Sequence, residues 1–240
     1  VVIHFLYRKR QIIRLDKLLV ELNIGTRSEV KTLLKRGLIC VNGEKILKPE
    51  TKVDEETAVI TYAGKEYKYR KFAYYLINKP AGVITATEDS SQTTIMDIFY
   101  KKCPDAPRGL SPVGRLDKDT TGLLLITNDG ALAHDMLSPK KHVDKKYFVT
   151  LDGELTKENV VALESGVHIG EGENTLPASV EYDGGNTCYI TIHEGKFHQV
   201  KRMFFAVGRE VIALKRVSFG PYILDEEKLP QSEVIEVVRI

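Results

Sequence analysis

A carboxylate and an arginine share a loop bounded by glycines at residues 114–122, which read Gly-Arg-Leu-Asp-Lys-Asp-Thr-Thr-Gly. The loop runs directly into residues 123–126, an apolar stretch typical of a buried strand. This order places Asp117 and Arg115 at the edge of a sheet. A substrate that reaches this edge can contact the fixed negative charge of Asp117 and the long cationic side chain of Arg115.

Three further segments carry polar residues in a recognisable order. Residues 77–82 read Ile-Asn-Lys-Pro-Ala-Gly, residues 145–147 read Lys-Lys-Tyr, and residues 194–204 read Glu-Gly-Lys-Phe-His-Gln-Val-Lys-Arg-Met-Phe. Together with residues 114–122 they resemble, in the same order along the chain, the motifs of pseudouridine synthases. One motif alone is a weak signal, whereas four in order are a strong one. The resemblance is greatest to the RsuA type, which modifies small-subunit ribosomal RNA.

The resemblance implies a reaction and the residues that perform it. Such an enzyme breaks the bond from C1′ of ribose to N1 of uracil, turns the base and joins C1′ to C5. The residues that match the catalytic positions of the family are Asp117, Tyr147 and Lys201. The resemblance also places Leu214 under the base, and the alternative is that Leu214 is a plain core residue.

Asp117 has three possible roles, among which the sequence does not choose. A carboxylate can attack the electron-poor C1′, stabilise its charge, or remove the 2′ proton, and each role requires an ionised group in a water-poor pocket. Lys201 is the cation expected to keep it ionised. The alternative is that Asp117 only caps a backbone amide in a turn.

The remaining candidates concern the RNA. Tyr147 is expected to stack on the uracil, and its phenol could accept the C5 proton. Arg115 could fill the gap left when the uridine leaves its stack, or hold the flanking phosphate. We also expect Lys79 and Arg202 to meet backbone phosphates.

We predict a helix over residues 196–207. Its spacing places His198, Lys201 and Phe205 on one face, with Phe197, Val200, Phe204 and Val207 packed behind. The pair Phe197-His198 favours a small-subunit target, since large-subunit relatives usually carry Asn-Arg there. Lys201-Arg202 departs from the more usual Arg-Arg and loses a bidentate fork.

The first part of the chain has the pattern of a small RNA-binding domain. Leu15, Leu18, Leu19 and Leu22 predict a first helix, and Thr26 with Glu29 has capping-box spacing for a second. Asn42-Gly43 between two apolar runs predicts a hairpin. Residues 14–60 resemble the S4 RNA-binding domain. Its expected RNA contacts are Arg14, Lys17, Arg27, Lys31 and Lys35.

The charge distribution supports this division. Residues 1–71 hold 16 Lys and Arg against 9 Asp and Glu, whereas residues 72–240 hold 19 against 24. A basic first part on a mildly acidic second part favours a polyanionic partner held by the first. Ribosomal RNA, as 16S RNA in an assembly intermediate, is the partner we expect.

We predict an α+β fold in four segments. These are an extension of doubtful origin (1–13), the S4 domain (14–60), a linker (61–71) and the catalytic domain (72–240). The catalytic domain should hold a mostly antiparallel mixed sheet flanked by helices. Its predicted strands are 74–77, 122–127, 146–151, 187–193 and 210–218. Its predicted helices are 93–101, 130–137, 156–164 and 196–207.

Composition limits the other possibilities. Cys40, Cys103 and Cys188 form no Cys-x-x-Cys pair, which argues against zinc or a disulfide framework and favours a reducing cytoplasm. The apolar start precedes Arg8-Lys9-Arg10, the reverse of a signal peptide. We expect no metal and no cofactor, because the isomerisation is redox-neutral, and nothing demands more than a monomer.

Two rival functions remain. Residues 117–121 also fit Asp-x-Asp-x-Thr, the signature of haloacid-dehalogenase-type phosphatases. In those phosphatases the aspartates follow a buried strand, whereas in this chain they precede one. The other rival is an RNA-binding or ribosome-assembly module without activity. A synthase that acts on 23S RNA is the alternative within the same family.

Overall fold

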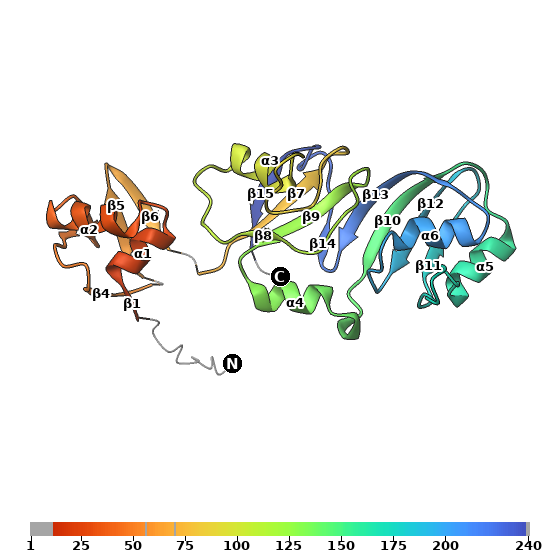
Figure 1. Cartoon of the computed structure of the whole chain (residues 1–240), viewed down its shortest axis with the longest axis horizontal. Helices are drawn as coiled ribbons and strands as arrows, with labels where there is room; N and C mark the ends of the chain where they lie inside the picture. The colour runs from red at the N-terminus through yellow and green to blue at the C-terminus, as the bar shows by residue number, and fades with distance from the viewer. Residues whose placement is uncertain (1–11, 56, 70, 239–240) are drawn as a thin grey trace, which may run out of the picture. The chain divides into compact units, whose positions relative to one another are not determined.

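The computed structural model describes residues 12–55, 57–69 and 71–238, which form two compact units. The small unit reaches Ala73 and includes Asp105–Gly109, and the large unit comprises Tyr74–Pro104 and the chain from Leu110 onward (Figure 1). No helix within the described residues is long and apolar enough to cross a membrane.

The small unit contains the two predicted helices, α1 (Leu15–Glu21) and α2 (Arg27–Lys35). The capping box is present, since the Glu29 N–H donates to the Thr26 hydroxyl and the Glu29 carboxylate accepts from the Thr26 N–H. The side chains that the helices bury in the core of this unit are Leu15, Leu18, Leu19, Val30 and Leu34.

The strands of the small unit complete this core. The sheet order is β3-β2-β5-β6, formed by Glu44–Lys45, Ile39–Val41, Val59–Tyr62 and Lys65–Lys68. A separate pair joins β1 (Ile12–Arg14) to β4 (Lys52–Asp54). The predicted hairpin between β2 and β3 is confirmed. Asn42 and Gly43 have φ of 50° and 86°, the positive values that a two-residue type I′ turn requires.

The predicted linker at residues 61–71 is wrong over residues 61–69. This segment completes β5 and forms β6, and Tyr67 and Tyr69 pack against the core of the small unit. The interleaved tyrosines are therefore the inward positions of an alternating strand. The small unit also begins earlier than predicted, because Ile13 is buried in β1; residues 1–11 of the predicted extension lie outside the described residues.

The large unit is built on a nine-stranded mixed sheet with the order β11-β12-β10-β13-β9-β7-β15. Strand β14 pairs with β13, and β8 pairs with β9. The β9–β13 pair is parallel and the other pairs are antiparallel, as predicted. The strands are β7 (Tyr74–Lys79), β8 (Ser111–Pro112), β9 (Thr121–Thr127), β10 (Lys145–Leu151), β11 (Ser179–Glu181), β12 (Thr187–Ile192), β13 (Val211–Phe219), β14 (Tyr222–Ile223) and β15 (Val234–Val237).

The five predicted strands of this sheet are present, and each begins within one residue of its prediction. Strands β8, β11, β14 and β15 were not predicted. They are two to four residues long, too short for an alternating pattern to show.

Four helices among the described residues of this unit flank the sheet (Figure 1). They are α3 (Ile95–Lys102), α4 (Gly130–Leu137), α5 (Lys157–Ser165) and α6 (Gln199–Ala206), with a 3₁₀ turn η1 (Pro139–Lys141). Helices α5 and α6 share a core with β10, β12 and β13, and Phe99 of α3 contacts the Tyr75 ring of β7 edge to face. Three helix predictions agree within two residues, but α6 begins three residues later than predicted.

The close approach of β9 to β13 depends on Gly122. Its φ is 103°, and a Cβ at this position would lie 2.3 Å from the carbonyl oxygen of Arg216. Only glycine therefore lets the two strands meet where Gly122 pairs with Arg216. The contact places the loop of Asp117 beside β13.

Replacing Gly122 by alanine is expected to destabilise the large unit more than its backbone angle alone explains. Gly184 is a matched control, with φ of 107° and no atom within 4 Å of an added Cβ. Gly184→Ala should cost about 1–2 kcal/mol of strain. Gly122→Ala should cost about 1–3 kcal/mol more because of the clash. Urea unfolding measures both, and equal costs would contradict the close approach.

Candidate active site

A buried ammonium group holds the loop that carries Asp117. The Nζ of Lys79, at the end of β7, donates to the backbone carbonyls of Asp117 (3.0 Å), Lys118 (3.3 Å) and Thr120 (2.8 Å), and to that of Pro80 (3.1 Å). The segment at residues 77–82 thus supports the loop at residues 114–122, which explains physically why both motifs occur in one chain.

Two further contacts fix the same loop. The Thr85 hydroxyl donates to the Leu116 carbonyl (2.7 Å) and accepts from the Leu116 N–H (3.1 Å). The Gly82 N–H donates to the Lys118 carbonyl (2.8 Å). The backbone on both sides of Asp117 is therefore set before any substrate binds.

The predicted phosphate contact of Lys79 is wrong. The residue is 0% exposed, and its ammonium faces carbonyl oxygens. Burial lowers the pKa of Lys79 to about 8, while the charges of Asp119 and Asp117 oppose this shift. Lys79 therefore acts on the loop from within the fold rather than on RNA.

The Asp117 carboxylate lies between two basic side chains. The Nζ of Lys201 is 3.4 Å from its Oδ2, and the Nε2 of His198 is 3.5 Å from its Oδ1. The side chain of Asp117 is 26% exposed, so a substrate can reach it. The structure thus places Lys201 beside Asp117, as the sequence predicts, and brings His198 to the same carboxylate.

Lys201 also contacts a second carboxylate of the same loop, that of Asp119. Its Nζ donates to both oxygens of Asp119, at 2.6 and 2.7 Å. This hydrogen bond lowers the pKa of the Asp119 carboxyl, against the opposing effect of burial. Asp119 therefore holds Lys201 at the rim of the site.

Apolar side chains of the core adjoin the loop through Leu116. Tyr147 of β10 and Leu214 of β13 are each 7% exposed and belong to one core cluster with Leu116 and Val200. Leu116 precedes Asp117 by one residue. The predicted base-contacting residues therefore adjoin the loop of Asp117 through a shared core.

A second buried cation was missed from the sequence. Arg216 is 2% exposed, its Nε donates to the Leu123 carbonyl (2.8 Å), and its guanidinium lies 4.5 Å from the Phe219 ring centroid. Burial lowers its pKa, while Tyr147, its hydrogen-bonding partner on β10, opposes this. Its Nη2 has no hydrogen-bond partner among the described residues. An arginine at an inward position of a buried strand was the available signal.

Arg202 and Arg115 differ in their freedom to meet RNA. Arg202 donates to the carbonyls of Ile169 (2.9 Å) and Phe197 (3.1 Å) and pairs with Glu173 (2.8 Å). These contacts occupy its guanidinium, so the predicted phosphate contact is not supported. Arg115 is exposed and makes no hydrogen bond or ion pair with another described residue, which leaves it available to a substrate.

The turn before α6 corrects the predicted helix at residues 196–207. His198 has a left-handed φ of 47°, so the helix begins only at Gln199. The Gln199 side chain accepts a hydrogen bond from the Lys196 N–H. Val200 and Phe204 pack inward as predicted. Phe197 does not, since it precedes the helix and is 73% exposed.

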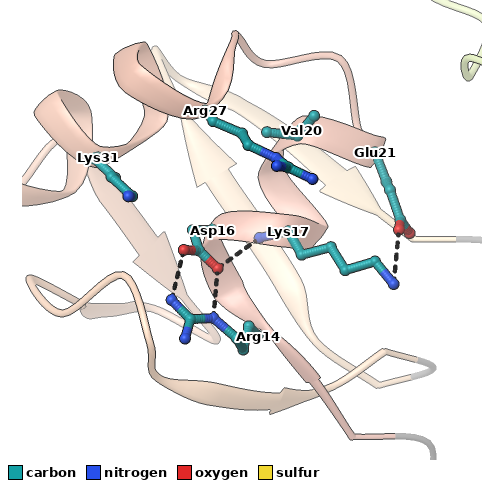
Figure 2. Close-up of a pocket in the computed structure, with 7 residues that line it drawn as sticks. All are labelled: Arg14, Asp16, Lys17, Val20, Glu21, Arg27 and Lys31. Atoms are coloured by element: carbon teal, nitrogen blue, oxygen red, sulfur yellow. Dashed lines mark hydrogen bonds and ion pairs between the residues drawn. The ribbon is translucent and has the colours of Figure 1, made fainter.

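The small unit contains a pocket of about 530 Å³ between its two helices (Figure 2). Arg14 holds Asp16 with two hydrogen bonds, and Lys17 pairs with Glu21. Arg27 and Lys31 also line the pocket and form no ion pair with a carboxylate of a described residue. Four of the five predicted RNA contacts thus surround one pocket, and Lys35 lies outside its lining.

Comparison with known proteins gives the same two parts. The family model described as RNA pseudouridylate synthase matches residues 73–206, and the S4 domain matches residues 13–59. This chain belongs to the RNA pseudouridine synthase family. The predicted family and the S4 domain are thereby confirmed.

Several relatives span nearly the whole chain. An uncharacterised RNA pseudouridine synthase of Bacillus subtilis, YtzG, is 48% identical over 90% of this chain and 92% of its own length. The ribosomal small subunit pseudouridine synthase A of Haemophilus influenzae is 35% identical over 94% of this chain and all of its own length. The ribosomal large subunit pseudouridine synthase B of B. subtilis is 36% identical over 86% and 85%.

A solved structure agrees with the fold. A crystal structure of a pseudouridylate synthase superimposes with a TM-score of 0.64 at 32% identity, covering 94% of this chain and 96% of that one. The protein is therefore an RNA pseudouridine synthase enzyme with an N-terminal S4 domain.

Replacing Lys79 by methionine is expected to destabilise the large unit by about 1–3 kcal/mol, because buried carbonyls lose their donor. Lys201→Met is the matched control. Its ammonium is partly exposed and its ion pairs contribute little to stability, so its unfolding should stay near that of the wild type. Urea unfolding of the two variants checks this. A Lys79→Met protein as stable as Lys201→Met would contradict the anchoring role.

Proposed function

We propose that this protein isomerises one uridine of 16S ribosomal RNA to pseudouridine, with Asp117 as the catalytic carboxylate. The observation that carries the proposal is the placement of Asp117 on a fixed loop between Lys201 and His198, partly open to solvent. A carboxylate held next to C1′ attacks it, stabilises its charge or removes the 2′ proton. All three begin from this arrangement.

The uracil is proposed to meet the apolar side of the site. Tyr147 stacks on the base, and its oxygen takes up the C5 proton as its own hydroxyl proton passes to water. Leu214 lies beneath the base. Arg216 is the positioning residue behind Tyr147, because it is the phenol's hydrogen-bonding partner on the neighbouring strand.

The 16S target rests on two observations. Relatives named ribosomal small subunit pseudouridine synthase A match 90–94% of this chain at 35–39% identity. Phe197-His198 also stands where large-subunit relatives usually carry Asn-Arg. The large-subunit enzyme of B. subtilis, at 36% identity, makes 23S RNA the second candidate.

The small unit is proposed to hold the RNA. Its pocket presents Arg27 and Lys31, which pair with no carboxylate of the described residues, whereas Arg14 and Lys17 are already paired with acids. Unpaired cations bind phosphate without first breaking an ion pair, and they release counterions when they do so. We propose that the protein works as a monomer in the cytoplasm.

Release of tritium from C5-labelled RNA tests the target, since the isomerisation replaces the C5–H bond by C5–C1′. The wild-type protein should release about one equivalent from unmodified 16S RNA and none from 23S RNA. Release from 23S RNA alone would assign the enzyme to the large subunit. No release from either RNA, with RNA binding retained, would favour a binding module.

The salt dependence of RNA binding tests the small unit. Arg27→Ala with Lys31→Ala should lower the log–log slope of affinity against salt by about 1.4–1.8, since each phosphate contact contributes about 0.7–0.9. Lys45→Ala with Lys52→Ala is the control, because these exposed lysines lie in the same unit outside the pocket. Equal slopes for both double variants would refute a specific role for the pocket.

A further inference from the structure

An exposed aromatic ring stands next to the catalytic carboxylate. Phe197 is 73% exposed, although phenylalanine is among the residues most often buried. One face of its ring stacks on the imidazole of His198, with ring centroids 3.8 Å apart and planes 18° apart. The other face of the ring is therefore the one open to solvent.

The backbone holds this ring outward. His198 has a left-handed φ of 47°, a conformation that costs a non-glycine residue free energy and is often kept at functional sites. Arg202 donates to the Phe197 carbonyl (3.1 Å) and is itself fixed by Ile169 and Glu173. The exposure of Phe197 is thus built into the fold.

The ring also lies within one side chain of the reaction centre. His198, on which it stacks, places Nε2 3.5 Å from Asp117 Oδ1. Whatever the open face of Phe197 contacts is therefore a neighbour of the group that Asp117 acts on. In an RNA pseudouridine synthase that group is the target uridine.

We propose that Phe197 is a stacking platform for a nucleobase adjacent to the target uridine. A uridine that leaves its stack exposes the face of its neighbour, at a cost of a few kcal/mol in lost stacking. Unstacked RNA bases are commonly recognised by stacking on aromatic side chains. Phe197 replaces the lost contact, which leaves Arg115 to hold the flanking phosphate. The inference rests on the proposed function, because it takes Asp117 to be the reaction centre.

Three variants separate stacking from apolar contact. Phe197→Leu keeps an apolar side chain but removes the flat face, and Phe197→Trp keeps a flat face. Phe205→Leu is the matched control, since this phenylalanine is 80% exposed at the far end of α6. Each substitution is at an exposed ring, so thermal unfolding should match that of the wild type.

The rate of tritium release from C5-labelled 16S RNA and the RNA affinity are measured for each. Stacking on one base corresponds to about a 5- to 150-fold effect. We expect Phe197→Leu to lose kcat/KM by a factor in that range, with Phe197→Trp within threefold and Phe205→Leu within twofold of the wild type. The proposal fails if Phe197→Leu behaves as the wild type, if Phe197→Trp loses as much as Phe197→Leu, or if Phe205→Leu loses equally.

Affinity keeps this test separate from the proposed function. The Kd for 16S RNA is measured for the single variant Asp117→Asn and for the double variant that also carries Phe197→Leu. This comparison of binding requires no turnover. If the wild type releases no tritium, the proposed function fails. A weaker Kd for the double variant then still supports the stacking contact, and an unchanged Kd overturns it.

Discussion

The Lys79 ammonium lies inside the large unit, surrounded by the carbonyl oxygens of Pro80, Asp117, Lys118 and Thr120. A buried charge is tolerated only where polar atoms replace its water, and here the backbone of the loop that carries Asp117 provides them. The loop therefore cannot shift without leaving this charge unsolvated. The position of Asp117, and with it the contacts to Lys201 and His198, depends on that constraint.

A fixed backbone matters because electrostatic stabilisation is effective when the charges do not need to reorganise during the reaction. Lys201 and His198 both approach Asp117 from α6 and the turn before it, while Asp119 holds Lys201 from the loop itself. The two segments, far apart in the chain, are thus tied together by charge at the site. Gly122 supports this arrangement by letting β9 lie against β13.

Local signals made much of this structure predictable. The capping box at Thr26, the Asn42-Gly43 turn and the five long strands follow from patterns within a few residues, and the loop of Asp117 was recognised from its own motif. Lys79, Arg202 and Arg216 could not be placed in this way. A lysine or arginine is usually exposed, and only the tertiary structure shows which cations are surrounded by carbonyls or acids. The strand in the predicted linker was missed because its alternation included lysines, which suggested solvent on both faces.

Asp117, rather than the neighbouring carboxylate of Asp119, is proposed to perform the chemistry. Asp117→Asn and Asp119→Asn are matched, since both remove a carboxylate that contacts Lys201 from the same loop. The most direct measurement is tritium release from C5-labelled 16S RNA by the two variants, once binding has shown that their affinities for the RNA are equal. Asp117→Asn should release no tritium, whereas Asp119→Asn should continue to turn over the RNA. Turnover by Asp117→Asn, or its loss only in Asp119→Asn, would contradict this role of Asp117.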